Sequence, residues 1–454
     1  AGEPFDAPMK PMGGGEEIAI STDGARIAYT CKKMNGVEYA TSTNSEIYLY
    51  ELATGKTTNL SEGNKGYDRV PEFSPDGSRL VWQSMAEDGY EADQNRLILY
   101  DFKTRTKRDL TQGYDNSVDA HHWSPNGQVV YFTSGINATI QFFVADPRMR
   151  SAIVWRQLSD ELADYTAFTV ATNGKREDVI VATREDLSHP AELFVFDPKT
   201  KSSRQLTQVN GEALKALKMG EVRKRMVKAT DGKEILTWVV YPPNFDASKK
   251  YPTLLYCQGG PQSMVGQFFS YRWNLQLMAA NGYIVVAPNR RGLPGFGKAW
   301  NDDIQGDWGG QPMRDLISAI DDVAKEPYVN KDKLGAVGAS FGGYSVFWLA
   351  GHHEKRFKCF ISHNGVYNLE SSIATEEPFF PIHEFEGNFW QSPKPKSYEQ
   401  FSPQKFVQFW DTPILIIANE KDYRVPYTQG LEAFSAARLR GIPARLLSFP
   451  DENH

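Results

Sequence analysis

The sequence predicts a mixed fold, in which an all-β repeat region is followed by an α/β domain. Two observations carry this prediction. A turn signal ending in Asp-Gly or Asn-Gly recurs in the first half, and its glycines, Gly24, Gly77, Gly127 and Gly174, are 53, 50 and 47 residues apart. From about residue 222 onward, apolar runs alternate with stretches of helical character. Such alternation is typical of a parallel sheet whose strands are joined by helices.

The repeat region has the pattern of a β-propeller. Short apolar runs follow the turns, as at 80–82 and 129–132, and a second set occurs at 47–50, 97–100, 142–144 and 193–196. Asp-Gly and Asn-Gly between such runs favour tight hairpins, because both dipeptides tolerate positive φ. Four short strands in each period indicate propeller blades, with an ordinary β-sandwich as the alternative. About four blades fit in this chain, fewer than such propellers usually need to close, so we expect further blades before Ala1.

The second half predicts strands that are buried on both sides. A strand-like run at 235–241 comes first, and further candidates follow at 253–257, 283–287, 334–337, 357–361, 414–418 and 445–449. Helical stretches lie between them at 312–325, 341–351 and 429–440. Continuous apolar runs such as 414–417 fit a parallel sheet that is covered by helices. We therefore divide the chain into a propeller at 1–221, incomplete at its N-terminus, and an α/β domain at 222–454, incomplete at its C-terminus.

Composition and charge exclude several classes of function. The chain has 454 residues, and 50 Lys plus Arg against 56 Asp plus Glu give a net charge of −6. A mildly acidic chain without a dense basic run is a poor candidate for binding nucleic acid or an anionic membrane. No apolar run of the sequence approaches the roughly 20 residues that span a bilayer. The cysteines, Cys31, Cys257 and Cys359, lie far apart and do not indicate a disulfide framework.

The strongest chemical signal is Gly-Ala-Ser-Phe-Gly at 338–342, between a predicted strand and a predicted helix. In this context the pattern G-x-S-x-G is a nucleophile elbow, the strained turn of α/β-hydrolase domains. The flanking glycines are needed because side chains there would collide as the backbone folds back. The turn presents the Ser340 hydroxyl at a helix N-terminus, where the helix dipole favours developing negative charge. Ser340 is thus the predicted nucleophile, and the α/β domain is predicted to be an α/β-hydrolase.

A serine nucleophile needs a histidine base and a carboxylate that orients it. In α/β-hydrolase domains the chain order is Ser, then Asp or Glu, then His. Asp422 and Glu420 both follow the strand at 414–418, and the sequence context favours Asp422, with Glu420 as a solvated loop residue. His454 is the one histidine after Asp422. The predicted triad is therefore Ser340, Asp422 and His454.

The oxyanion of the reaction needs two hydrogen-bond donors. We expect one to be the backbone N–H of Phe341, directly after the nucleophile. The Gln-Gly-Gly-Pro loop at 258–261 follows a predicted strand, and its paired glycines allow a close backbone approach, so the Gly260 N–H is the second candidate; a plain glycine turn is the alternative. No His/Cys/carboxylate cluster has metal-ligand spacing, so neither a metal nor a cofactor is expected.

These motifs together resemble the prolyl oligopeptidase family of serine peptidases. The resemblance covers the blades, the Gly-Gly-Pro loop, Asn-Arg-Arg-Gly at 289–292, the elbow, 422–426 and His454. In detail the chain resembles the branch that holds acylaminoacyl peptidases and dipeptidyl peptidases. This implies release of dipeptides from free peptide N-termini, with Ala or an apolar residue before the scissile bond. An acylaminoacyl peptidase or an oligopeptidase on the same scaffold is the alternative.

The resemblance also implies roles for residues outside the triad. Phe341, Tyr344, Val366 and Val425 match positions that line the pocket for the side chain before the scissile bond, and Arg424 joins them in binding substrate. Gln258 stands near the place where proline-specific relatives carry an oxyanion tyrosine, which argues against strict cleavage after proline. The family normally continues into a last helix beyond His454, so we expect the chain to be truncated there.

A dipeptidyl peptidase must also hold the substrate ammonium, which requires a carboxylate where water is largely excluded. The segment 85–93 interrupts its repeat with four acids, and Glu91 is the first choice among them; solvated loop charges are the alternative. Expected partners are oligopeptide substrates, with neither nucleic acid nor membrane. The oligomeric state is open, with a homodimer as one option. By resemblance the compartment is periplasmic or secreted if the source is bacterial, with the cytoplasm as the alternative.

Overall fold

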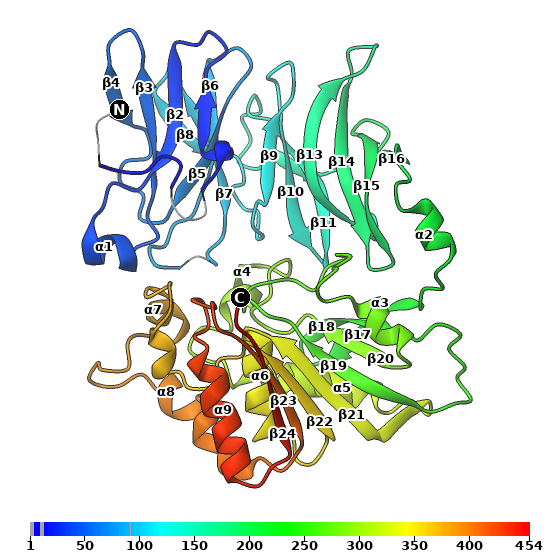
Figure 1. Ribbon diagram of the computed structural model, residues 1–454. Coiled ribbons are helices and arrows are strands. Elements are labelled where there is room, and N and C mark those ends of the chain that lie inside the picture. Colours follow the sequence, from blue (N-terminus) through cyan, green and yellow to red (C-terminus); the bar gives the residue numbers. More distant parts are fainter. Residues whose placement is uncertain (1–3, 10–12, 91) are drawn as a thin grey trace. The chain divides into compact units, whose positions relative to one another are not determined.

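The computed structural model describes residues 4–9, 13–90 and 92–454, which form two compact units (Figure 1). The first unit holds the residues up to 186 together with 191–209, and the second holds 187–190 together with 210–454. The boundary predicted from the sequence lies between residues 221 and 222, slightly later in the chain than the change of unit at 209/210. The predicted domain boundary stays a prediction. The described residues contain no helix that is long and apolar enough to cross a membrane.

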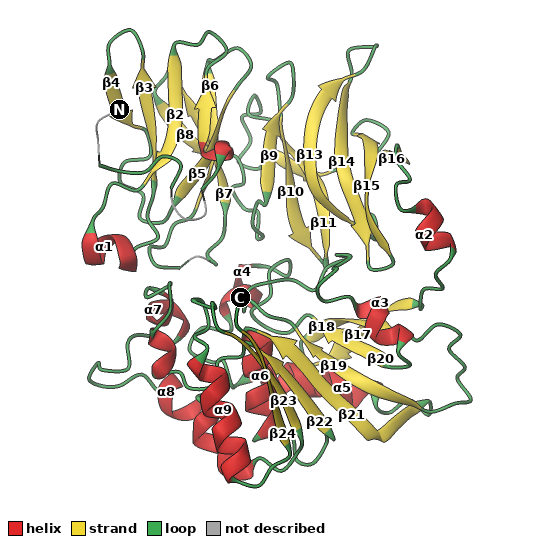
Figure 2. Ribbon diagram, viewed as in Figure 1, coloured by secondary structure: helices red, strands yellow, loops and turns green. Residues whose placement is uncertain are grey.

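Among the described residues of the first unit, the strands fall into four groups of four, which Figure 2 shows in yellow. The first two groups are separate sheets, and the last two join into one sheet through a single parallel pair, Ile140 with Asp164. The groups are β1 (Ile18–Ile20), β2 (Arg26–Cys31), β3 (Glu46–Glu51) and β4 (Lys56–Asn59); β5 (Asp68–Phe73), β6 (Arg79–Ser84), β7 (Arg96–Asp101) and β8 (Thr106–Asp109); β9 (Ala120–Trp123), β10 (Val130–Ile136), β11 (Thr139–Ala145) and β12 (Trp155–Gln157); and β13 (Asp164–Thr172), β14 (Asp178–Asp186), β15 (His189–Asp197) and β16 (Ser202–Gln205). The predicted propeller fold with about four blades is confirmed.

Three of the four predicted turns have the same geometry. In each, the glycine N–H donates to the carbonyl of the serine three residues earlier at 2.8 Å, and the glycine φ lies between 66° and 69°. These glycines are Gly24, Gly77 and Gly127. The fourth signal, at 171–174, forms a different turn, in which Arg176 rather than Gly174 takes positive φ, at 60°. The serine at the start of the other turns is an alanine here, so the hydroxyl that closes them is absent.

The second unit is built on one sheet of eight strands in the order β17-β18-β20-β19-β21-β22-β23-β24. All neighbours from β20 to β24 along this order are parallel, while β17 and β18 are antiparallel to theirs. The strands are β17 (Val222–Lys228), β18 (Glu234–Val240), β19 (Tyr251–Cys257), β20 (Ile284–Pro288), β21 (Val329–Ala339), β22 (Cys359–His363), β23 (Ile414–Asn419) and β24 (Ala444–Phe449). The predicted α/β-hydrolase fold is confirmed.

The α-helices of the second unit are α2 (Gly211–Lys215), α3 (Leu275–Ala280), α4 (Lys298–Asp302), α5 (Gln311–Val323), α6 (Phe341–Ala350), α7 (Phe380–Glu384), α8 (Ser397–Gln400) and α9 (Thr428–Leu439), with 3₁₀ helices at Ser371–Ile373 and Pro403–Phe409. Of these, α3, α5, α6 and α9 pack against strands of the sheet. The first unit adds α1 (Gly36–Thr41) and a 3₁₀ turn at Gly15–Glu17.

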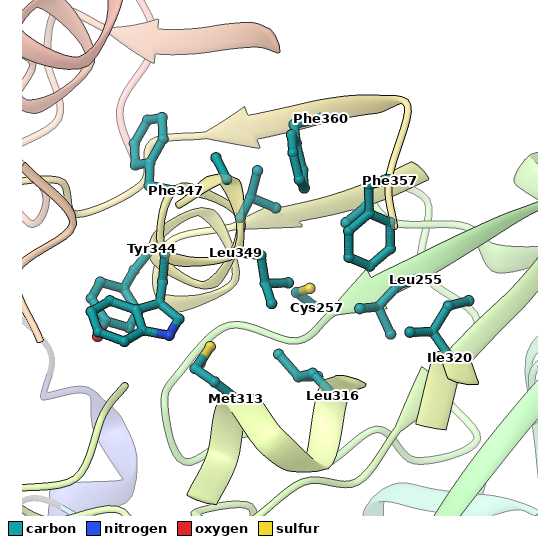
Figure 3. Packing of buried hydrophobic residues seen from close by; sticks show 14 of the residues in the cluster. Leu255, Cys257, Met313, Leu316, Ile320, Tyr344, Phe347, Leu349, Phe357 and Phe360 are labelled. Atoms are coloured by element: carbon teal, nitrogen blue, oxygen red, sulfur yellow. The ribbon is translucent and has the colours of Figure 1, made fainter. Parts of the chain in front are cut away.

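The largest core lies around α6, whose residues are all buried. Figure 3 shows Leu349 of α6 on the side of the helix that faces Cys257 of β19, while Phe347 lies on another side of the helix; both belong to the same buried cluster, together with Leu316 of α5. An apolar helix that is buried all round is held rigidly by its neighbours. The residue at its N-terminus, Ser340, is therefore set on a fixed support.

Candidate active site

Ser340 lies in the sharp turn between β21 and α6, as the sequence predicts. It is the N-cap of α6 with φ 58° and ψ −122°, a strained conformation for a residue with a side chain. A Cβ at Gly338 would lie 2.5 Å from the Gly342 carbonyl oxygen, and one at Gly342 would lie 2.1 Å from the Cys257 oxygen. Both glycines of the motif are thus required by close backbone approach.

Ser340, His454 and Asp422 form a continuous chain of hydrogen bonds. The Ser340 Oγ lies 2.9 Å from His454 Nε2, and His454 Nδ1 lies 2.7 Å from Asp422 Oδ2. The other carboxylate oxygen of Asp422 accepts the backbone N–H groups of Arg424 at 3.0 Å and Val425 at 2.8 Å. Because the Asp422 side chain is fully buried, these bonds fix the direction in which it faces His454.

The sheet topology brings the three residues together although 114 positions separate Ser340 from His454. They follow β21, β23 and β24, and the carboxyl ends of parallel strands meet at one edge of a sheet. The loops after β23 and β24 are also tied to each other. Asn419 Nδ2 donates to the Asn453 carbonyl at 2.6 Å, and the Lys421 N–H donates to the Glu452 carbonyl at 3.1 Å.

Of the two carboxylates after β23, the structure brings Asp422 to His454. Glu420 is exposed and accepts a hydrogen bond from Ser448 Oγ at 3.2 Å. Another histidine, His363 at the end of β22, lies near the triad. Burial, together with the nearby charge of Arg272, lowers the pKa of His363 to about 4. His363 is therefore neutral at physiological pH and adds no charge beside the triad.

A cavity of about 510 Å³, counting its open mouth, lies beside Ser340. Most of its lining is apolar or aromatic, which suits an uncharged side chain. The lining comprises Gly260, Trp308, Ser340, Phe341, Val366, Ser372, Thr375, Glu377, Phe380, Pro381, Phe385, Arg424 and Val425. Val366, Val425 and Arg424, which the sequence assigned to substrate binding, are among them.

Tyr344 is not among the residues that line this cavity, and its part in substrate binding stays a prediction. It lies one turn into α6, fully buried, and its hydroxyl donates to the Phe401 carbonyl at 2.8 Å. Its ring packs against Trp308 and Phe341 at centroid distances of 5.0 and 5.2 Å. Tyr344 therefore supports two lining residues from behind, because the rotation of α6 carries its side chain into the core.

The two predicted oxyanion donors lie at the same cavity as Ser340. The N–H of Phe341 is in the first turn of α6, where backbone N–H groups have no partner within the helix. The loop 258–261 comes close to the nucleophile, since a Cβ at Gly259 would lie 3.6 Å from Ser340 Cβ. Gly260 has φ 117°, which favours glycine.

One wall of the cavity was not predicted from the sequence. The segment between β22 and β23 contributes Ser372, Thr375, Glu377, Phe380, Pro381 and Phe385. It carries no motif and no regular apolar period. Its length could nevertheless have indicated this role, because a long segment that begins at the carboxyl end of a parallel strand often covers a ligand site.

An ion pair joins this wall to the loop that carries Asp422. Arg424 Nη1 lies 2.5 Å from Glu377 Oε1, and both side chains are mostly buried. Two further hydrogen bonds at 2.8 Å run from Thr375 Oγ1 to the Arg424 carbonyl and from the Glu376 N–H to the Tyr423 carbonyl. The cavity therefore contains one carboxylate and one guanidinium that neutralise each other.

Glu91 lies outside the described residues, and its role in binding the substrate ammonium stays a prediction. Two other acids of its segment accept hydrogen bonds from backbone N–H groups. Asp88 Oδ1 accepts the Thr43 N–H at 2.8 Å, and Asp93 Oδ2 accepts the Ala86 N–H at 2.8 Å. Across the described ranges, no cluster of three or more His, Cys, Asp or Glu side chains could hold a metal ion.

Comparison with known proteins places both units. Residues 269–454 match the prolyl oligopeptidase family, and residues 18–215 match the TolB beta propeller domain. Dipeptidyl-peptidase 5 of Porphyromonas gingivalis is 47% identical over 456 residues, which cover all of this chain and 66% of that protein. Dipeptidyl-peptidase 5 of Porphyromonas endodontalis is 48% identical over 458 residues, covering 100% and 65%. The chain thus spans just under two thirds of the length of these relatives.

Solved structures share the fold. Acylaminoacyl peptidase of Pyrococcus horikoshii superposes with a TM-score of 0.81 at 24% identity, covering 95% of this chain and 65% of that one. Dipeptidyl peptidase 4 of Porphyromonas gingivalis superposes with a TM-score of 0.67 at 19% identity, covering 96% and 71%. At these identities the likeness shows a shared fold, which is the arrangement of strands and helices.

Proposed function

We propose that this chain, which belongs to the prolyl oligopeptidase family, is a serine peptidase that releases dipeptides from the free N-termini of oligopeptides. The observation that carries the proposal is the unbroken hydrogen-bond chain from Ser340 through His454 to buried Asp422, at the edge of an apolar cavity. The dipeptidyl-peptidase names of relatives that are 47% and 48% identical support the substrate class.

In this mechanism Ser340 Oγ attacks the carbonyl of the second residue of the substrate. His454 Nε2 takes the serine proton and then gives it to the leaving amine, while Asp422 stabilises the imidazolium that forms between these steps. The products of this half are the shortened peptide and an acyl-enzyme. Water, deprotonated by His454, then attacks the ester carbonyl and releases the dipeptide, which restores the Ser340 hydroxyl.

The backbone N–H groups of Phe341 and Gly260 are the proposed donors to the oxyanion in both halves. Donors of this kind are already oriented before the reaction, so they stabilise the developing charge without rearrangement. The side chain before the scissile bond would enter the cavity, because Ser340 and both donor residues line it. Its apolar lining by Trp308, Val366 and Val425 supports a preference for Ala or apolar residues there.

The order of products released from one oligopeptide tests the proposal. A peptide of eight different residues with a free N-terminus is incubated with the protein, and products are followed by mass spectrometry. We expect intact dipeptides to appear in sequence from the N-terminus. The same peptide with an acylated N-terminus is incubated in parallel. Release of its single acylated residue, or of internal fragments, would instead support the acylaminoacyl-peptidase or oligopeptidase alternative, for which the fold of the acylaminoacyl peptidase from Pyrococcus horikoshii is the precedent.

Compartment and assembly are proposed on the resemblance to bacterial members of the family. We propose that the protein is periplasmic or secreted if its source is bacterial, with the cytoplasm as the alternative, and that it assembles as a homodimer. Fractionation of the source cells and light scattering of the purified protein test these two statements. Recovery of the activity in the cytoplasmic fraction would contradict the first, and a monomeric mass would contradict the second.

A further inference from the structure

Two consecutive buried arginines, Arg290 and Arg291, follow β20, and their surroundings differ. Arg291 is surrounded by carboxylates: its Nη1 and Nη2 lie 2.7 and 2.8 Å from Asp231, and its Nε lies 3.2 Å from Asp315. Arg290 is fully buried, and no carboxylate within the described ranges lies at hydrogen-bond or ion-pair distance from it. Ion pairs with carboxylates therefore compensate for the burial of the Arg291 side chain, whereas no such pair compensates for the burial of Arg290.

The contacts of Arg290 converge on the oxyanion donors. Its Nη2 donates to the carbonyls of Gln258 at 3.3 Å and Pro261 at 3.1 Å, which flank the Gly259-Gly260 dipeptide. Its guanidinium also lies over the ring of Phe341, 4.1 Å from the centroid. One side chain therefore touches both segments that carry the proposed donors, the glycine loop and the first residue of α6.

Stability alone gives no reason for this placement. Burying a charge without a carboxylate partner is unfavourable, and an apolar side chain of similar volume at such a site is often as stable or more stable. The unfavourable burial is visible in the lowered pKa of Arg290, about 9. The group nevertheless stays positive at neutral pH. A buried charge kept beside a catalytic site points to a functional role.

We propose that Arg290 is a positioning residue for the oxyanion hole, holding the glycine loop and Phe341 in register so that their backbone N–H groups converge on the reacting oxygen. Besides a bond from Nη1 to the Arg291 carbonyl at 2.7 Å, it makes two hydrogen bonds to the glycine loop that fix this loop on either side of Gly260, and its stacking fixes the ring of Phe341. Its positive charge also favours the negatively charged tetrahedral intermediate over the neutral substrate. The inference rests on the proposed function.

The distinguishing property of this role is that it acts on the transition state more than on bound substrate or product. The test compares two ligands of wild-type protein and variants. One is a dipeptide boronic acid, which forms an anionic tetrahedral adduct with a serine nucleophile. The other is the corresponding free dipeptide, the product, which has no tetrahedral centre. The affinity ratio of boronate to product isolates the oxyanion hole from general effects on the site.

In Arg290→Met we expect kcat for a dipeptide amide to fall about 10-fold to 100-fold. This is at most the decrease in kcat that removal of one oxyanion donor causes, about 100-fold to 1000-fold. KM and product affinity should change little, and the affinity ratio should fall by the same factor as kcat. Arg290→Lys keeps the charge but not the forked geometry, so it should recover part of the loss. The matched control is Arg291→Lys, which should lower Tm through its ion pairs while leaving the affinity ratio at the wild-type value.

An unchanged ratio in Arg290→Met, or equal losses of boronate and product affinity, would overturn the inference. If the Arg290 variants do not fold, Phe341→Leu provides the test. This variant keeps the backbone N–H but removes the ring under the guanidinium, so the ratio of boronate to product affinity should fall. A wild-type ratio in this variant would overturn the inference. Failure of the proposed function is distinct. A wild-type protein that neither cleaves the dipeptide amide nor binds the boronate would overturn both, whereas activity with an unchanged variant ratio overturns this inference alone.

Discussion

Replacing Asp422 by Asn should abolish turnover while leaving the fold intact. The Asp422 carboxylate is fully buried, and one of its oxygens accepts two backbone N–H groups, from Arg424 and Val425, at 3.0 and 2.8 Å. An asparagine has the same shape, and its carbonyl oxygen can keep both of these bonds. The loop after β23 should therefore stay in place, and Tm should remain close to that of the wild type.

The damage arises at the other carboxylate oxygen, 2.7 Å from His454 Nδ1. The asparagine places an NH₂ group there, so the imidazole must accept at Nδ1 and carry its proton on Nε2. That proton then points at Ser340 Oγ, 2.9 Å away, and the histidine can no longer act as a base. A wrong tautomer of this kind lowers kcat on the order of 10⁴-fold. At about 1.36 kcal/mol for each factor of ten, the loss is roughly 5.4 kcal/mol of barrier.

The assay is steady-state hydrolysis of a chromogenic dipeptide amide by wild type, Asp422→Asn and Glu420→Gln. Glu420→Gln is the matched control, since it makes the same chemical change two residues away on an exposed side chain. It should retain activity close to wild type. The reasoning is refuted if Asp422→Asn keeps a tenth of the wild-type kcat, or if the two variants lose activity equally.

Three further predictions concern the cavity, the pH dependence and the elbow. Substrates with Asp or Glu before the scissile bond should have kcat/KM at least about 100-fold below those with Leu, since burying Leu gains roughly 2 kcal/mol and an apolar cavity disfavours a carboxylate; equal cleavage would contradict the assigned lining. Burial lowers the pKa of His121 from 6.5 to about 4. Between these two pH values the unfolded state binds a proton at this histidine and the folded state does not, so the free energy of unfolding should fall by up to about 3 kcal/mol as the pH drops from 6.5 to 4. Denaturant unfolding of His121→Gln should show a shallower slope there, and an unchanged slope would contradict this. Gly342→Ala should lower both Tm and kcat, because its Cβ would lie 2.1 Å from the Cys257 oxygen; wild-type values of both would show that the backbone can relax.

The triad could be predicted because each member carries a local signal in a fixed chain order. The glycines around Ser340 report a tight turn, and Asp422 and His454 each follow an apolar strand. Parallel strands that end at one edge then bring these distant residues together. The alternative, Glu420, has the right charge and position in the chain, and the sequence context favoured Asp422 over it. The backbone N–H groups of Arg424 and Val425 set the direction of the Asp422 side chain, and these two bonds follow from the folded loop rather than from a sequence pattern.

The parts that the sequence missed depend on contacts between segments far apart in the chain. The cavity wall that holds Glu377 and Phe380 belongs to an irregular excursion, where neither helical nor strand periodicity applies. The sequence could not show that the Tyr344 hydroxyl bonds the Phe401 carbonyl, because a position one turn along α6 can face either the cavity or the core. The motif around Arg290 was visible, but its contact with Phe341 follows from packing alone.

The most direct test of the central claim combines the nucleophile with the substrate terminus. Wild type and Ser340→Ala are compared on a panel of chromogenic dipeptide amides, each with a free and with a blocked N-terminus. We predict that wild type cleaves the free substrates and cleaves the blocked ones at least tenfold more slowly, about 1.4 kcal/mol in selectivity. Ser340→Ala should retain less than about 0.1% of the activity, as expected for loss of a triad member. A variant that retains a tenth of the wild-type rate, or a wild type that prefers the blocked substrates, would contradict the proposal of a serine dipeptidyl peptidase.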